Sequence, residues 1–130
     1  TLLAVFSLLA ITTSCEKTEP IHLVSDTNLK GQNTIPVPAE GGTIHVTCTN
    51  YESFSVYEYS VTVDKQPFKD PNSTTISPVS LTPWLKTTVN KNVMTVVFEP
   101  NTTSKVRITI FEITAGDVRT RLRFEQEAKK

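Results

Sequence analysis

The chain contains 130 residues, in which 13 lysines and arginines balance 13 aspartates and glutamates, so the formal net charge at pH 7 is zero. A balanced chain has no long-range field that attracts polyanions, which argues against nucleic-acid binding. Because there are only two cysteines, the fold must be stabilised by a hydrophobic core and not by a disulfide framework.

The N-terminal stretch has the layout of an export signal. An apolar run from Leu2 to Ile11 is followed by small residues and then Cys15. The run is too short to span a bilayer but has the length of the apolar part of a signal peptide. The small residues before the cysteine resemble the cleavage site of bacterial lipoproteins. We therefore expect residues 1–15 to be a lipoprotein signal peptide, begun upstream of Thr1 and ending at a lipidated Cys15.

The composition changes twice after the signal. Residues 16–33 are mostly polar, which predicts a flexible tether with at most one short strand around Ile21 to Val24. From Thr34 onward apolar residues recur at a spacing of two, and clusters of Pro, Gly, Asn and Ser interrupt them. This pattern predicts one all-β domain over residues 34–130.

Seven segments of this domain have strand patterns. Pro36 and Pro38 place the first segment at a sheet edge, and the apolar phase of the third slips near Val56, which predicts a β-bulge. The proline-rich stretch 65–82 predicts a long connection. We expect an immunoglobulin-like antiparallel β-sandwich. The predicted strands are Ile35–Val37, Thr43–Thr49, Ser53–Val63, Trp84–Val89, Val93–Glu99, Lys105–Ile113 and Val118–Gln126. Cys48 alternates with Ile44 and Val46, so it is interpreted as a small buried side chain.

Aromatic side chains are the first candidates for a ligand site. Trp84, the one tryptophan, could stack on a sugar ring, but a tryptophan that begins a strand of a sandwich is more often part of the core. Tyr57 and Tyr59 share a parity within one strand, so their rings are expected about 7 Å apart on one face. They could form a platform for two sugar units or lie at the rim of the core.

Arg119, Arg121 and Arg123 form a second candidate, because they alternate along the last strand. Three guanidinium groups on one face could bind sulfate or carboxylate groups of a glycan. The alternative is a solvated face, or an edge strand protected from pairing by its charge. Glu125 and Glu127 are near enough in sequence to neutralise the arginines.

Catalytic and metal-binding residues are not expected. The two histidines, His22 and His45, fall in the tether and on the wet face of a strand, so neither a catalytic triad nor a three-ligand zinc site can be assembled. We expect a protein that is not an enzyme and that needs no cofactor.

Four short motifs resemble the BACON domain, a small β-sandwich of exported Bacteroidetes proteins. They are Ala39–Thr43, Pro83–Leu85, Asn101 with Arg107–Ile110, and Phe124–Gln126. The resemblance implies a non-catalytic module that binds carbohydrate or mucin glycans, or else a structural spacer or protein–protein assembly module. With the lipid signal, it implies an outer-membrane lipoprotein of the cell envelope, on the periplasmic face or the cell surface. The expected partners are the membrane and either glycans or an envelope protein.

Overall fold

The computed structural model describes residues 19–27, 29–31, 33–68 and 83–130. The predicted signal peptide with Cys15 and most of the 65–82 connection lie outside these residues. Within them the chain forms strands and no helix, so no helical segment there could cross a membrane.

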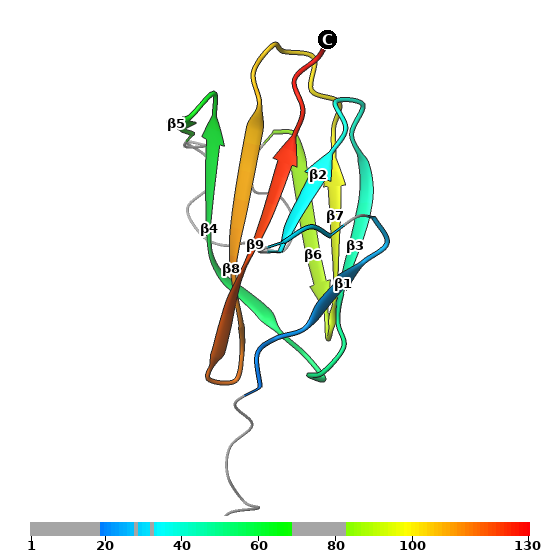
Figure 1. The fold of residues 1–130 in the computed structure, drawn as a ribbon, viewed down its shortest axis with the longest axis vertical. Helices are drawn as coiled ribbons and strands as arrows, with labels where there is room; N and C mark the ends of the chain where they lie inside the picture. The colour runs from blue at the N-terminus through cyan, green and yellow to red at the C-terminus, as the bar shows by residue number, and fades with distance from the viewer. Residues whose placement is uncertain (1–18, 28, 32, 69–82) are drawn as a thin grey trace, which may run out of the picture.

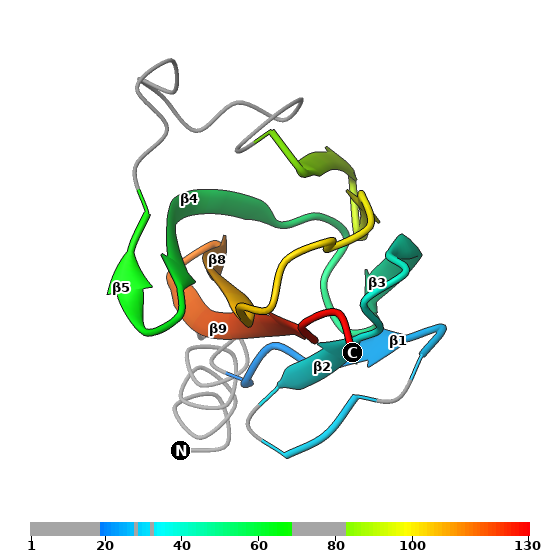
Figure 2. The same ribbon diagram turned by 90° about the horizontal axis from the view of Figure 1, so that it is seen from above.

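The strands form two sheets that pack face to face (Figures 1 and 2). The first sheet has the order β1 (Leu23–Ser25), β3 (Gly42–Cys48), β7 (Val93–Phe98) and β6 (Leu85–Asn90). The second has the order β2 (Thr34–Val37), β9 (Val118–Gln126), β8 (Arg107–Ala115), β4 (Ser55–Val63) and β5 (Gln66–Pro67). The first order matches the A-B-E-D sheet of the immunoglobulin fold, and the three central strands of the second, β9, β8 and β4, match its G-F-C sheet, which confirms the predicted sandwich. One pairing departs from the antiparallel expectation, because β2 runs parallel to β9.

Alternating side chains from both sheets fill the core. The inward residues of β3 include Val46 and Cys48, both fully buried, and Cys48 is a free thiol, as predicted. Phe124 lies at the centre, with its ring centroid 5.3 Å from that of Phe98 and 5.8 Å from that of Phe111. Tilted and edge-to-face pairs of this kind stabilise a core beyond the area that they bury. Apolar packing, with no disulfide at Cys48, therefore forms the core of the sandwich.

The sandwich begins earlier in the chain than the sequence pattern predicted. Ile21 and Leu23 are 7% and 5% exposed and belong to the core, and β1 pairs antiparallel with β3. The short strand allowed for within residues 16–33 is therefore confirmed as β1, and it packs against the core, which the expectation of a flexible tether did not include. Strand β1 lies at the edge of its sheet and needs hydrogen bonds to β3 only. Ile21 and Leu23, two residues apart, supply its apolar contacts with the core.

The edge at β2 is protected against pairing with another chain. In the parallel ladder the carbonyl oxygens of Asn33 and Val37 accept hydrogen bonds from the Arg123 and Glu127 amides of the β9 segment. The alternate positions face the open side, where Thr34 exchanges hydrogen bonds with Lys30 and the two prolines lack an N–H group. The prediction of an edge segment is confirmed, and the prolines explain why the edge stays unpaired.

Candidate functional site

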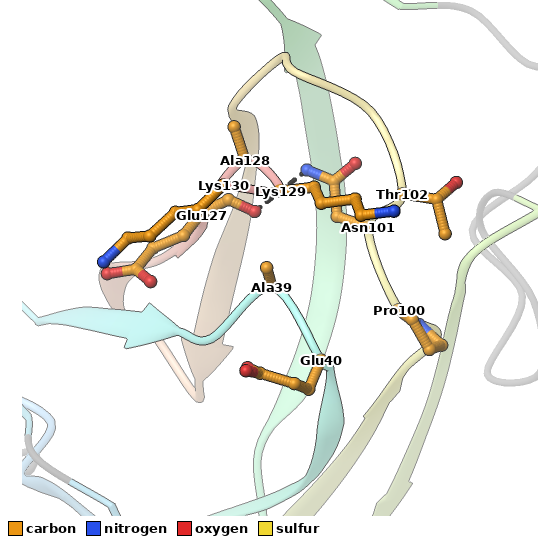
Figure 3. A pocket seen from close by; sticks show the side chains of 9 residues that line it. All are labelled: Ala39, Glu40, Pro100, Asn101, Thr102, Glu127, Ala128, Lys129 and Lys130. Carbon is orange, nitrogen blue, oxygen red and sulfur yellow. Dashed lines mark hydrogen bonds between the residues drawn. The ribbon is translucent and has the colours of Figure 1, made fainter.

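A pocket of about 400 Å³ lies at one end of the sandwich (Figure 3). Three segments that are distant in sequence form its walls: the turn between β2 and β3, the loop after β7, and the residues that follow β9. Its lining residues are Ala39, Glu40, Pro100, Asn101, Thr102, Glu127, Ala128, Lys129 and Lys130. The volume falls in the lower part of the range of small-molecule sites.

Asn101 holds the three walls together. Its backbone N–H donates to the carbonyl oxygen of Ala39 at 2.7 Å, and its side-chain amide donates to those of Lys105 and Glu127 at 2.8 and 3.0 Å. Its Oδ1 atom accepts hydrogen bonds from the backbone and the hydroxyl of Thr103. The asparagine is only 2% exposed, so these bonds replace all the water that its amide would otherwise bind. The hydrogen bonds of Asn101 therefore fix the positions of the segments that line the pocket.

The turn between β2 and β3 depends on a glycine. Gly41 has a φ of 79°, and a Cβ atom added there would lie 2.3 Å from the carbonyl oxygen of Phe98. Only a residue without a Cβ atom can let the turn approach the end of β7 so closely. This contact brings Ala39 and Glu40 beside the loop after β7 and so closes the pocket on that side.

The pocket offers both donors and acceptors to a ligand. Glu40 and Glu127 contribute carboxylates, and Lys129 and Lys130 contribute ammonium groups. The nine lining residues include no histidine, cysteine or serine that could act as a nucleophile or base. No cluster of three or more metal-ligating side chains occurs among the described residues. The lining thus presents groups of both charges with which a polar molecule could form hydrogen bonds.

The structure separates the two predicted platform tyrosines. The register of β4 shifts between Val56 and Glu58, so the predicted bulge is confirmed and Tyr57 is its extra residue. Tyr59 pairs with the buried Phe111 and packs against the core. Tyr57 is 38% exposed, and its ring centroid lies 4.9 Å from the guanidinium carbon of Arg119 on the outer face of the sheet. The expectation that the rings share one face is wrong, because the bulge changes the alternation between them.

The arginines of β9 face outward, as expected. Strand β9 pairs with β8 along its whole length but with β2 only from Arg123 to Gln126, so among the described strands the segment with Arg119 and Arg121 is open on one side. The interpretation of an edge protected by its charge therefore applies to Arg119 and Arg121 but is wrong for Arg123. Arg121 donates to Glu112 and Arg123 to Glu125, each at 2.7 Å. Arg119 contacts Tyr57 instead. Neighbouring carboxylates thus compensate two of the three charges, as the sequence indicated for Glu125.

Trp84 lies partly buried against the core at the start of β6. Its ring centroid is 4.7 Å from that of Phe68 and 4.3 Å from the guanidinium carbon of Arg107. Burial lowers the pKa of Arg107, because the charged guanidinium loses water there. The indole is therefore one member of an internal stack and does not stand out as a separate sugar-binding surface.

The histidines lie on the outer face of the sheet that contains β1 and β3. His22 Nδ1 is 2.8 Å from the hydroxyl of Thr49, and His45 Nδ1 is 2.8 Å from a carboxylate oxygen of Asp26. The other oxygen of Asp26 accepts a hydrogen bond from the His45 amide. Burial raises the pKa of Asp26, but the hydrogen bonds and charge of His45 outweigh it, so the net pKa lies below 3.8.

Sequence reasoning did not single out the pocket, although some of its residues had been noted. Ala39, Glu40 and Asn101 lie in the motifs that resemble the BACON domain. The signals in the sequence are the glycine pair Gly41–Gly42 and the asparagine of Pro100–Asn101. Neither signal predicts that the β2–β3 turn contacts the loop after β7, because that contact depends on the pairing of β2 with β9 and of β3 with β7.

Comparisons with known proteins support the fold. No protein-family model matches the chain, and no curated protein matches it. A solved structure, described as the NMR structure of the protein from Bacteroides thetaiotaomicron, is similar, with a TM-score of 0.68 and 22% sequence identity. The likeness covers 90% of this chain and 94% of that chain. At this identity it shows a shared fold, and the chain is therefore similar in architecture to a Bacteroides β-sandwich protein.

Proposed function

We propose that this protein is a lipid-anchored, non-catalytic module of the bacterial cell envelope that binds glycans in the pocket at the end of the sandwich. The position of the pocket carries the proposal. The first described residues, Glu19 and Pro20, lie at the opposite end of the sandwich from the C-terminal segment that lines the pocket (Figure 1). A lipid on Cys15 would hold that first end at the membrane, so the pocket would face away from it.

The chemistry of the lining supports a sugar as the ligand. Sugar hydroxyls both donate and accept hydrogen bonds, and the pocket presents carboxylates on Glu40 and Glu127 and ammonium groups on Lys129 and Lys130. The resemblance to the BACON module supports an envelope protein, and the Bacteroides structural neighbour shares the sandwich fold.

A spacer or assembly module is the second candidate. The dispersed aromatic side chains favour it: Tyr57 and Tyr59 lie on different faces, and Trp84 is part of an internal stack. Sugar sites commonly use exposed aromatic rings, and no aromatic residue lines the pocket.

A glycan array probed with the full chain in detergent micelles tests the proposal. We expect retention on at least one glycan class, with a loss of tenfold or more when Glu40→Gln and Glu127→Gln are combined. Thr88→Ala, on the outer face of the other sheet, is the matched control and should retain binding. Absence of retention on every glycan would reject the proposal in favour of a spacer. If Tyr57→Ala abolishes retention and the combined Glu40→Gln and Glu127→Gln variant does not, the glycan site lies at the Tyr57–Arg119 surface and not in the pocket.

A further inference from the structure

The two outer faces of the sandwich differ sharply in charge. The outer face of the sheet that contains β9 carries six charged residues: Glu58, Glu112, Arg119, Arg121, Arg123 and Glu125. The outward positions of the other sheet are Val24, Thr43, His45, Thr47, Lys86, Thr88, Asn90, Val93, Thr95 and Val97. We call this second set the Thr/Val face. Lys86 is its one residue with a permanent charge.

The Thr/Val face combines little charge with exposed apolar side chains. Several of its cross-strand pairs consist of threonines and valines, such as Thr43 with Val97 and Thr88 with Thr95. Val24 is 42% exposed and Val97 is 36% exposed, although both are β-branched apolar residues. Depletion of charge and exposed apolar side chains are features of the centre of protein interfaces.

The charges at the borders of the face are complementary to one another. Lys86 lies on the edge strand β6, and Asp26 follows the opposite edge strand β1, where it binds His45. Consider a second copy related to the first by a two-fold axis that lies between the two faces and runs parallel to the strands. Strand β6 of each copy then lies opposite β1 of the other copy. Lys86 of one copy lies one cross-strand row from Asp26 of the other, within reach of the long lysine side chain. A surface with this property is self-complementary, as a two-fold interface requires.

We therefore propose that a second copy of this chain packs face to face on the Thr/Val face. Strands about 4.8 Å apart and a rise of about 3.3 Å per residue give a face of roughly 20 Å by 20 Å, so the dimer would bury on the order of 800–1,000 Å² in total. An interface of this size is weak in solution. The lipid anchor proposed above, on which this step rests, would confine both copies to one membrane, raise their effective concentration and so favour the dimer.

Chemical cross-linking of the full chain in the cell envelope tests the contact. Sheets that pack face to face lie about 10 Å apart, so two Thr95→Cys side chains related by the axis would be close enough for a short bismaleimide linker. We expect a cross-linked dimer with Thr95→Cys. Ser60→Cys, on the outer face of the other sheet, is the matched control. It should give only the background of the wild-type chain, in which Cys48 is buried and the thiol of Cys15 would be blocked by the proposed lipid. Equal cross-linking from both positions, or none from Thr95→Cys, would overturn the proposal.

Charge reversal identifies the occupant as a second copy. We expect Lys86→Asp to reduce the dimer yield from Thr95→Cys at least fivefold and the addition of Asp26→Lys to restore it. Because Asp26 also binds His45, circular dichroism of each variant would confirm that the sandwich is intact. Failure of the second change to restore the yield in a folded variant would contradict the pairing of Lys86 with Asp26. A cross-linked adduct with a different envelope protein, in place of the homodimer, would assign the face to another partner and reject the proposal.

Discussion

The side-chain amide of Asn101 donates a 3.0 Å hydrogen bond to the backbone carbonyl oxygen of Glu127, across 26 residues of sequence. The bond joins the loop after β7 to the segment that follows β9, and a second bond from the Asn101 backbone reaches Ala39. One buried amide therefore determines how three separate segments meet around the pocket.

Replacement of Asn101 should destabilise the protein and open the pocket. We expect Asn101→Ala to lower the free energy of unfolding by about 2–4 kcal/mol, because it leaves backbone groups of Lys105, Glu127 and Thr103 without partners. Urea unfolding followed by tryptophan fluorescence would measure the change. Thr102→Ala, at an exposed position of the same loop, should alter it by less than about 0.5 kcal/mol. Similar values for the two variants would argue against the role of Asn101.

Substitution of Gly41 should be more harmful than substitution of another glycine with positive φ. In Gly41→Ala the new Cβ atom would lie 2.3 Å from the Phe98 carbonyl oxygen, so the turn must move away from β7. We expect a loss of about 2–4 kcal/mol in unfolding free energy. Gly116→Ala is the control, because its φ of 58° is also positive but nothing lies within 4 Å. It should cost only about 1–2 kcal/mol, the penalty of the left-handed conformation. If the two variants lose equal amounts of unfolding free energy, the contact between the new Cβ atom of Gly41→Ala and Phe98 does not destabilise the protein.

The Asp26–His45 pair should contribute to stability in a defined pH range. Since the folded pKa of Asp26 lies below 3.8, its ionised form is favoured by folding. The contribution is therefore fully present above the unfolded pKa, near 3.8, and is lost as pH falls through the lower folded pKa. NMR titration of the Asp26 carboxyl carbon would measure the folded value. In His45→Ala the midpoint should rise. An unchanged midpoint would exclude the imidazole of His45 as a cause of the shift, because the His45 backbone N–H still donates to Asp26 in this variant.

Arg107 and Trp84 should be energetically coupled. The guanidinium lies over the indole, while its Nη1 atom is buried without a hydrogen-bond partner among the described residues. The attraction to the ring and the loss of water therefore oppose each other, and we expect Arg107→Met to change the unfolding free energy by less than about 1 kcal/mol. A double-mutant cycle with Trp84→Leu should give a coupling energy of about 0.5–2 kcal/mol. A coupling near zero would show that the stack adds nothing to stability.

Most of the strands were predictable because their alternation is local. Val118–Gln126 was predicted with the observed bounds, and the slip near Val56 correctly indicated a bulge. The bulge also contains information that local alternation does not carry. A phase change in the sequence reveals that an extra residue exists, but the partner strand decides that it is Tyr57 and on which face its ring lies.

The candidate site was less predictable than the strands. The residues around Ile21 and Leu23 allowed one short strand, but its packing in the core was not predicted, because a three-residue strand has too little sequence to show a period. The pocket could not be predicted, because its walls come from turns and a terminal segment with no periodicity of their own.

From sequence alone follow the all-β class, the immunoglobulin-like sandwich, the edge position of the proline segment and the burial of Cys48. Each depends on residues within one strand, where a spacing of two assigns side chains to faces. The tertiary structure decided the parallel pairing of β2 with β9, the separation of Tyr57 from Tyr59, the ion pairs of the arginines and the pocket around Asn101. These features depend on which strands are neighbours, and strand order is set by packing between segments far apart in the chain.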